Sequence, residues 1–106
     1  MSVSENIRIL IEIVKAIENN STGDIMALML DAVETVAVTT NSTTHHVERI
    51  LNDVVTGGDM RYNLVDFGRI ISDYLLTGNK IPLKNLLMKN IQSGYDIEYV
   101  NNWYEK

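Results

Sequence analysis

The sequence predicts a single all-α domain of five or six short amphipathic helices, packed as an irregular or orthogonal bundle over residues 1–106. Apolar residues recur at helical spacing along most of the chain. Ser, Thr, Asn or Asp opens most of these segments and Asn or Gly closes them, as is usual at helix ends. Loops of three to seven residues separate the segments, which favours packing between sequential neighbours.

Composition excludes several classes of protein. The chain has 45% hydrophobic residues, no cysteine and a net charge of −5, so neither disorder nor a disulfide or thiolate-metal scaffold is expected. No basic segment precedes the first apolar run, and the longest apolar run, residues 25–30, is too short to span a bilayer. We therefore expect a cytoplasmic protein (in the host cytoplasm if the source is viral) without a membrane partner.

The first helix is expected over residues 2–19. Ser2 and Glu5 have the spacing of a capping box, in which the hydroxyl and the carboxylate each accept a hydrogen bond from a backbone N–H that the helix leaves unpaired. Glu5, Arg8, Glu12 and Lys15 share one face. The opposite face carries the apolar stripe Ile7, Leu10, Ile11, Val14 and Ile17.

The second helix, expected over residues 24–38, is apolar on nearly every side. Only Asp31, Glu34 and Thr35 interrupt the apolar character between residues 25 and 38. Such a helix is normally surrounded by its neighbours, so a central core position is the favoured interpretation. The alternative is that one side of it, including Met26 and Met29, lies in an interface with another subunit or a partner.

A polar loop at residues 39–44 separates the second and third helices, because small hydroxyl and amide side chains compete for backbone hydrogen bonds. The third helix is expected over residues 44–55, with Gly57 and Gly58 ending it. Its apolar face consists of Val47, Ile50, Leu51 and Val54.

The fourth helix is expected to begin near Asp59 or Asn63 and to run to Leu76, closed by residues 77–79. Gly68 in its interior suggests a close contact with another helix. The apolar stripe consists of Leu64, Phe67, Ile71, Tyr74 and Leu75.

The fifth helix is expected to start near Pro82 and to end at Gly94. Its pattern places Lys80, Lys84 and Lys89 outward, and Leu83, Leu86, Leu87 and Ile91 inward. A short sixth helix follows over residues 96–104, within an aromatic C-terminal segment at 95–106.

That aromatic segment is the strongest candidate for a contact surface. Tyr95, Tyr99 and Trp103 form one stripe, and Ile97, Val100 and Tyr104 form another. One neighbouring helix cannot bury both stripes. The favoured interpretation is that one stripe docks on the core. The alternative is that Tyr99, Trp103 or Tyr104 anchors a partner or a second copy of the chain, because aromatic residues dominate interface hot spots.

No motif predicts catalysis. His45 and His46 are adjacent and therefore point about 100° apart on a helix, so they do not easily share one metal ion, even with Glu48 and Asp53 nearby. No nucleophile elbow and no phosphate-binding glycine loop is present. We expect no enzyme, no metal and no cofactor.

Nucleic-acid binding is the alternative function. Residues 60–92 carry a net charge of +3, whereas residues 1–59 carry −6. The fourth and fifth helices have the length of a helix-turn-helix, and Lys80, Lys84 and Lys89 could contact phosphates. However, Tyr74 is too bulky for the first helix of that motif, and Lys84 occupies a position that is usually buried and aliphatic.

The favoured prediction is a small helical module that binds another protein and self-associates as a homo-oligomer. Eleven Asn, twelve Ile and a single Pro favour AT-rich codons. That bias is common in phages and mobile elements, so an accessory or inhibitor protein from such a source fits. The residues proposed to bind a partner are Tyr95, Tyr99, Trp103, Tyr104, Met26 and Met29.

Overall fold

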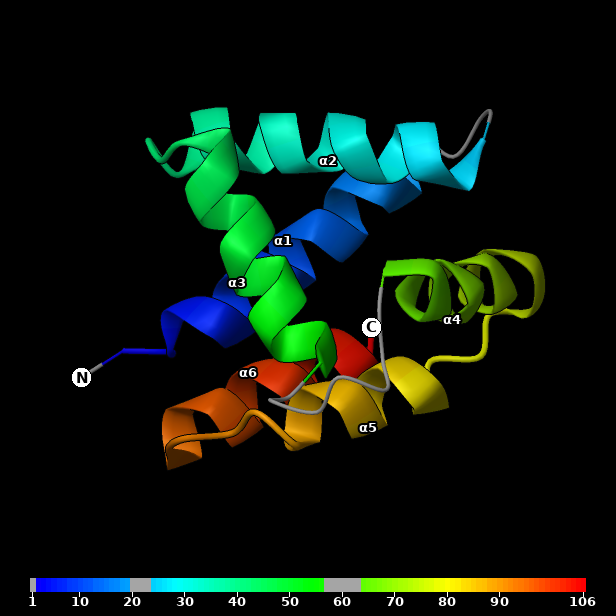
Figure 1. Cartoon of the computed structure of the whole chain (residues 1–106). Coiled ribbons are helices and arrows are strands. Elements are labelled where there is room, and N and C mark those ends of the chain that lie inside the picture. The colour runs from blue at the N-terminus through cyan, green and yellow to red at the C-terminus, as the bar shows by residue number, and fades with distance from the viewer. Residues whose placement is uncertain (1, 20–23, 57–63) are drawn as a thin grey trace.

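The computed structural model describes residues 2–19, 24–56 and 64–106, and helices are the only regular secondary structure in these ranges. This confirms the predicted all-α class. The radius of gyration is 12.8 Å, which is the value of a compact chain of this length. The helices are α1 (Glu5–Asn19), α2 (Ile25–Thr39), α3 (Thr44–Thr56), α4 (Leu64–Thr77), α5 (Ile81–Met88) and α6 (Gly94–Tyr104) (Figure 1).

Helix α1 lies at the centre of the bundle. It packs against α2, α3 and α6, and Figure 1 shows it passing behind α3, between α2 on one side of the molecule and α6 on the other. Ile9 and Ile13 widen its apolar stripe beyond the predicted positions, so most of its circumference is apolar. The buried residues of α1 are Ile7, Ile9, Leu10, Ile11, Ile13, Val14 and Ile17.

The central position of α1 differs from the sequence-based prediction, which favoured α2 for that place. Helix α2 buries one side only, and its apolar residues Met26, Leu30 and Val38 are exposed. Asp31 and Glu34 are also exposed, and they keep the outer side of α2 in water. The buried apolar residues of α1 cover more of its circumference than those of α2 do, so α1 is the helix that its neighbours surround.

The start of α1 also differs from the prediction. The helix begins at Glu5, and Ser2 lies before it, so the predicted capping box of Ser2 and Glu5 does not form at the helix end. Instead, the backbone N–H of Ser4 donates a hydrogen bond of 2.6 Å to Oδ1 of Asp96. The cap therefore comes from a carboxylate 92 residues away, which local sequence spacing cannot reveal.

The connection between α2 and α3 is shorter than the predicted loop at 39–44, because Thr39 and Thr44 belong to the helices. Asn41 adopts a left-handed conformation (φ 56°), which asparagine tolerates better than most residues. The Oγ1 of Thr43 accepts the N–H of His46 at 3.1 Å and caps the start of α3. All four residues predicted for the inner face of α3 are buried.

The α4–α5 connection follows the predicted closure at residues 77–79. Gly78 has a φ of 75°, and its N–H donates to the carbonyl of Tyr74 at 2.7 Å, which ends α4. Gly68 faces α2, where a Cβ added to it would lie 3.8 Å from Sδ of Met29. The predicted beginning of this helix at Asp59 or Asn63, and the terminators Gly57 and Gly58, lie outside the described residues.

Helix α5 ends earlier than predicted. Its last residue is Met88 rather than a residue next to Gly94, and Gly94 is the first residue of α6. The side-chain Nδ2 of Asn90 donates a hydrogen bond of 3.0 Å to the carbonyl of Leu86, and so satisfies a carbonyl of the last turn of α5. None of the described helices is long and apolar enough to cross a bilayer.

Candidate functional site

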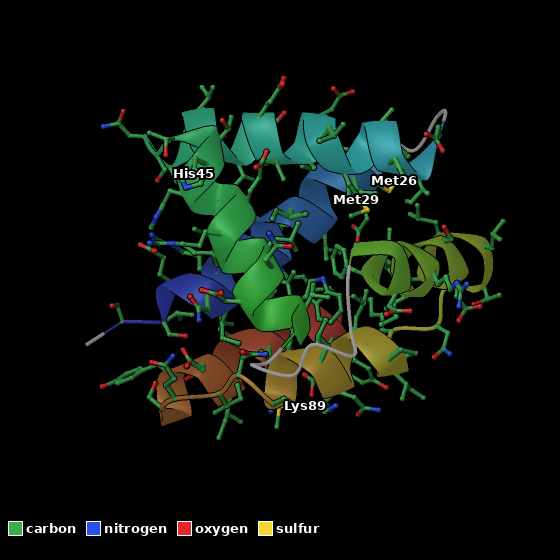
Figure 2. The ribbon with its side chains drawn as sticks, in the orientation of Figure 1. Met26, Met29, His45 and Lys89 are labelled. Carbon is green, nitrogen blue, oxygen red and sulfur yellow. The ribbon has the colours of Figure 1, made fainter. Side chains whose placement is uncertain are left out.

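An apolar cleft opens between α2 and α3. Its floor consists of the buried residues Met29 and Val33 of α2 and Leu51 of α3, and its volume is about 190 Å³. Met26 (40% exposed) and Leu30 (57% exposed) form the rim on the α2 side. Figure 2 shows Met26 and Met29 on the lower side of α2 in that view. The structure thus brings these two predicted binding residues together.

The polar groups at this cleft are acidic or neutral. Glu48 and Asn52 line its α3 side, and no lysine or arginine is among the described residues that line it. Helix α2 contains no basic residue, and its exposed Glu34 lies one helical turn beyond Leu30. Arg49 of α3 points to His46 instead, with its Nη2 3.3 Å from Nδ1 of the imidazole. An apolar cleft with acidic edges results.

The aromatic C-terminal segment is divided between core and surface. Trp103 is only 6% exposed and makes an edge-to-face contact with Tyr74, with ring centroids 6.4 Å apart. Tyr99 and Tyr104 are partly buried against the core, whereas Tyr95 is 46% exposed. Val100 of the other predicted stripe is also inaccessible, and Ile97 of that stripe is 41% exposed. Both stripes are therefore buried toward the C-terminal half of α6 and exposed toward its start, and their role in partner binding stays a prediction.

The two sets of predicted binding residues do not form one surface. Helix α2, with Met26 and Met29, and helix α6, with the aromatic residues, lie on opposite sides of the bundle with α1 between them (Figure 1). A single small partner cannot cover both sets at once.

Two of the three predicted outward lysines contact α6. The Nζ of Lys80 donates to the carbonyls of Trp103 (3.1 Å), Tyr104 (3.4 Å) and Lys106 (3.4 Å), and lies 5.0 Å from the Trp103 ring centroid. Lys84 places its Nζ 4.2 Å from the ring centroid of Tyr104. Lys89 is exposed. Phosphate binding by Lys80 would require it to leave the carbonyl groups that it now caps.

A buried carboxylate joins the two ends of the chain. Asp96 is inaccessible to solvent and accepts hydrogen bonds from the backbone N–H of Ser4 (2.6 Å) and of Gln92 (2.9 Å). Burial by itself raises the pKa of Asp96, but these donors outweigh burial and lower the pKa below its ordinary value of 3.8. The carboxylate is therefore a structural joint between α1 and α6.

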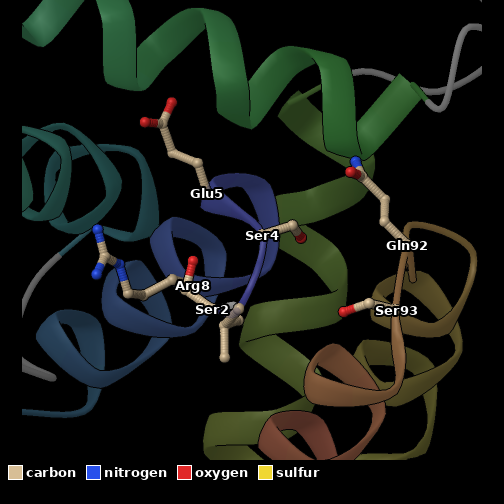
Figure 3. A pocket seen from close by; sticks show the side chains of 7 residues that line it. Ser2, Ser4, Glu5, Arg8, Gln92 and Ser93 are labelled. Atoms are coloured by element: carbon tan, nitrogen blue, oxygen red, sulfur yellow. The ribbon is translucent and has the colours of Figure 1, made fainter.

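A polar hollow of about 460 Å³ lies at this joint, lined by the first turn of α1 and the segment before α6 (Figure 3). Its side chains include Glu5 and Arg8 on one wall, and Gln92 and Ser93 on the other. The Asp96 carboxylate already accepts the N–H of Ser4 at this helix start. One backbone donor at this helix start is thus satisfied from within the protein and is not available to an anion.

Tyr74 links α4 to the end of α1. Its hydroxyl donates a hydrogen bond of 2.6 Å to Oε1 of Glu18. Burial, this hydrogen bond and the charge of Glu18 together raise the pKa of Tyr74 to about 12, so the phenol remains a donor throughout the neutral range. The pair orients α4 against α1.

The two adjacent histidines of α3 have different surroundings. His46 Nε2 lies 2.8 Å from Oε1 of Glu5, while His45 is exposed. Because the Arg49 guanidinium is only a donor, Nδ1 of His46 accepts and Nε2–H donates to Glu5. Across the described ranges, no group of three or more His, Asp or Glu side chains gathers in a way that could hold a metal ion.

Comparison with known proteins adds no relative: no family model, curated protein or solved structure matches this chain.

The residues of the cleft that the sequence did not single out are Leu30, Val33 and Asn52, and Glu48 was considered only as a neighbour of the histidine pair. Leu30 could have been found, because it lies four residues after Met26 and four before Glu34, on one stripe of α2. The sequence places Glu48 near His45 and His46 but gives no sign that it lines an apolar cleft. Its position in the same cleft as Leu30 depends on how α3 crosses α2, which no local pattern encodes.

Proposed function

We propose that this protein is an interaction module that binds another protein through the cleft between α2 and α3. The observation that carries the proposal is an apolar floor of Met29, Val33 and Leu51 beneath the exposed rim of Met26 and Leu30. Partly exposed apolar side chains around a buried floor are the usual form of a binding hot spot.

The size of the cleft supports a protein rather than a small molecule as the ligand. Small-molecule sites usually have volumes of roughly 300–1,000 Å³ and enclose most of the ligand. The cleft holds about 190 Å³ and is open, which suits one or two anchoring side chains of a larger partner. Self-association through the same rim also follows from the sequence and stays a prediction.

Affinity capture with matched variants tests the proposal. Leu30→Asp places a charge on the rim at a position that is already 57% exposed, so folding is little affected. Leu76→Asp is the matched control, since Leu76 is an exposed leucine of α4 that does not line the cleft. Wild-type protein and both variants are immobilised and exposed to a native lysate, and captured proteins are identified by mass spectrometry.

We expect a partner that the wild type and Leu76→Asp retain and that Leu30→Asp binds at least tenfold more weakly, a loss of about 1.4 kcal/mol. Circular dichroism of the variants verifies that the helices are intact. Equal capture by Leu30→Asp and Leu76→Asp would show that the cleft is not the binding site.

A further inference from the structure

The acidic edges of the cleft limit the kind of partner that fits it. On α2, Met26, Leu30, Glu34 and Val38 follow one another at four-residue intervals and form one exposed ridge, in which Glu34 is the charged residue. On the α3 side, Glu48 and Asn52 are also four residues apart and line the same cleft. A partner that covers the apolar rim therefore meets carboxylates on both walls.

No lysine or arginine of α2 or α3 lines the cleft beside these carboxylates. Helix α2 has no lysine or arginine. The one arginine of α3, Arg49, interacts with His46, which in turn is hydrogen-bonded to Glu5. Desolvating an acidic side chain without a counter-charge weakens binding, so a partner gains by bringing cations to Glu34 and Glu48.

We propose that the partner is an amphipathic helix of another protein, with apolar anchors about one turn apart and lysine or arginine beside them. This inference rests on the proposed function of the cleft. The charges favour such a helix over a second copy of this chain. A symmetric dimer through this face would set Glu34 and Glu48 of one copy against the same acidic residues of the other.

Helical geometry in the partner follows from the shape of the site. The cleft lies between two helices, and its α2 wall is a ridge of residues spaced four apart. A third helix laid along that ridge can place an apolar side chain in the 190 Å³ cleft. One turn farther along, a cationic side chain of the same helix reaches Glu34, which continues the ridge.

Three labelled peptides of roughly 18 residues, long enough to form helices, test this inference by fluorescence anisotropy. The first has a leucine stripe at three- and four-residue spacing flanked by lysines. The second replaces every lysine with glutamate. The third has the composition of the first, scrambled so that no apolar stripe remains. We expect the first peptide to bind at least tenfold more tightly than either of the others, and more weakly as salt is raised.

Charge reversal in the protein provides the matched comparison. The double variant Glu34→Lys/Glu48→Lys should bind the lysine peptide at least tenfold more weakly than wild type and should favour the glutamate peptide. Glu98→Lys/Glu105→Lys makes the same change of net charge on exposed residues of the α6 region and should change affinity less than twofold. If both double variants lost the same affinity for the lysine peptide, the effect would come from the net charge of the protein rather than from the cleft, and the inference would be wrong.

The outcomes separate this inference from the proposed function. If lysine and glutamate peptides bind equally and Leu30→Asp abolishes both, the cleft binds helices but the basic partner is wrong. If no amphipathic peptide binds and Leu30→Asp has no effect on capture, both proposals are wrong. A low-salt dimer through this face that is tighter than the peptide complex would make a second copy the occupant and overturn the inference.

Discussion

At the scale of single residues, Asp96 connects parts of the chain that lie far apart in sequence. Within the described residues it is the one buried polar or charged side chain, and its two oxygens accept N–H groups from Ser4 and Gln92. A buried carboxylate is stable only when its hydrogen bonds are complete. It thereby fixes α6 against the first turn of the central helix.

Replacing Asp96 with asparagine should destabilise the protein by about 1–3 kcal/mol at pH 7, because the new NH₂ group would face a backbone N–H. The pKa of Asp96 is lowered on folding, so its stabilisation is present above about pH 4 and is lost as pH falls through the folded pKa. The difference between wild type and Asp96→Asn should therefore shrink at pH 3, as measured by urea unfolding.

Glu98→Gln is the control for this experiment, since Glu98 is an exposed acid on the same helix. Its loss of stability should stay below about 0.5 kcal/mol at both pH values. If Asp96→Asn lost as little stability at pH 7 as Glu98→Gln does, the role assigned to the buried carboxylate would be wrong.

At the scale of helices, α6 is held at both ends by hydrogen bonds to other parts of the chain. Asp96 in its first turn accepts N–H groups from outside the helix, and the ammonium of Lys80 donates to carbonyls at its C-terminal end. A cation at a helix C-terminus is favourable because the helix dipole and the unpaired carbonyls are negative there. These contacts fix a helix of only 11 residues.

Lys80→Met keeps most of the aliphatic stem but removes the donor, so it should cost about 1 kcal/mol and increase fraying at the end of α6. Hydrogen exchange of the amide of Glu105, which donates to the carbonyl of Asn101, reports that fraying directly. Lys84→Met is the comparison, because Lys84 lies over the ring of Tyr104 and should leave this exchange rate nearly unchanged. Equal fraying in both variants would contradict the capping role of Lys80.

At the scale of the whole molecule, charge and apolar surface are distributed unevenly. Residues 1–59 carry a net charge of −6, and α2 within them exposes Met26, Leu30 and the 83% exposed Val38. Apolar area favours association of two such faces, whereas their carboxylates oppose it. The balance between the two depends on ionic strength.

We therefore expect the isolated chain to self-associate only weakly, at high micromolar protein concentration. Association should be stronger at about 0.5 M salt than at about 0.05 M salt, because the higher ionic strength shortens the screening length several-fold and weakens the repulsion between carboxylates. Light scattering coupled to size-exclusion chromatography measures this association. A basic helical partner should show the opposite salt dependence. A chain that stays monomeric under both conditions would exclude the predicted homo-oligomer.

Much of the local structure follows from the sequence because its signals are local. The apolar spacing of α3, the glycine at position 78 and the proline near the start of α5 each act within one or two helical turns. The end of α5 was predicted too late because Gly94 was interpreted as a terminator, whereas the side chain of Asn90 and the turn after Met88 end the helix. The terminators proposed at Gly57 and Gly58 lie beyond the described residues.

What the sequence by itself determined was the all-α class, the approximate span of the described helices apart from the end of α5, and the apolar excess of α2, since periodicity and caps are local properties. Tertiary structure alone decided that α1 is central, that Asp96 caps a helix 92 residues away and that Lys80 caps α6. It also placed Glu48 of α3 in the same cleft as Leu30 of α2. The physical reason is that these contacts depend on crossing angles between helices, which the packing of the whole core selects.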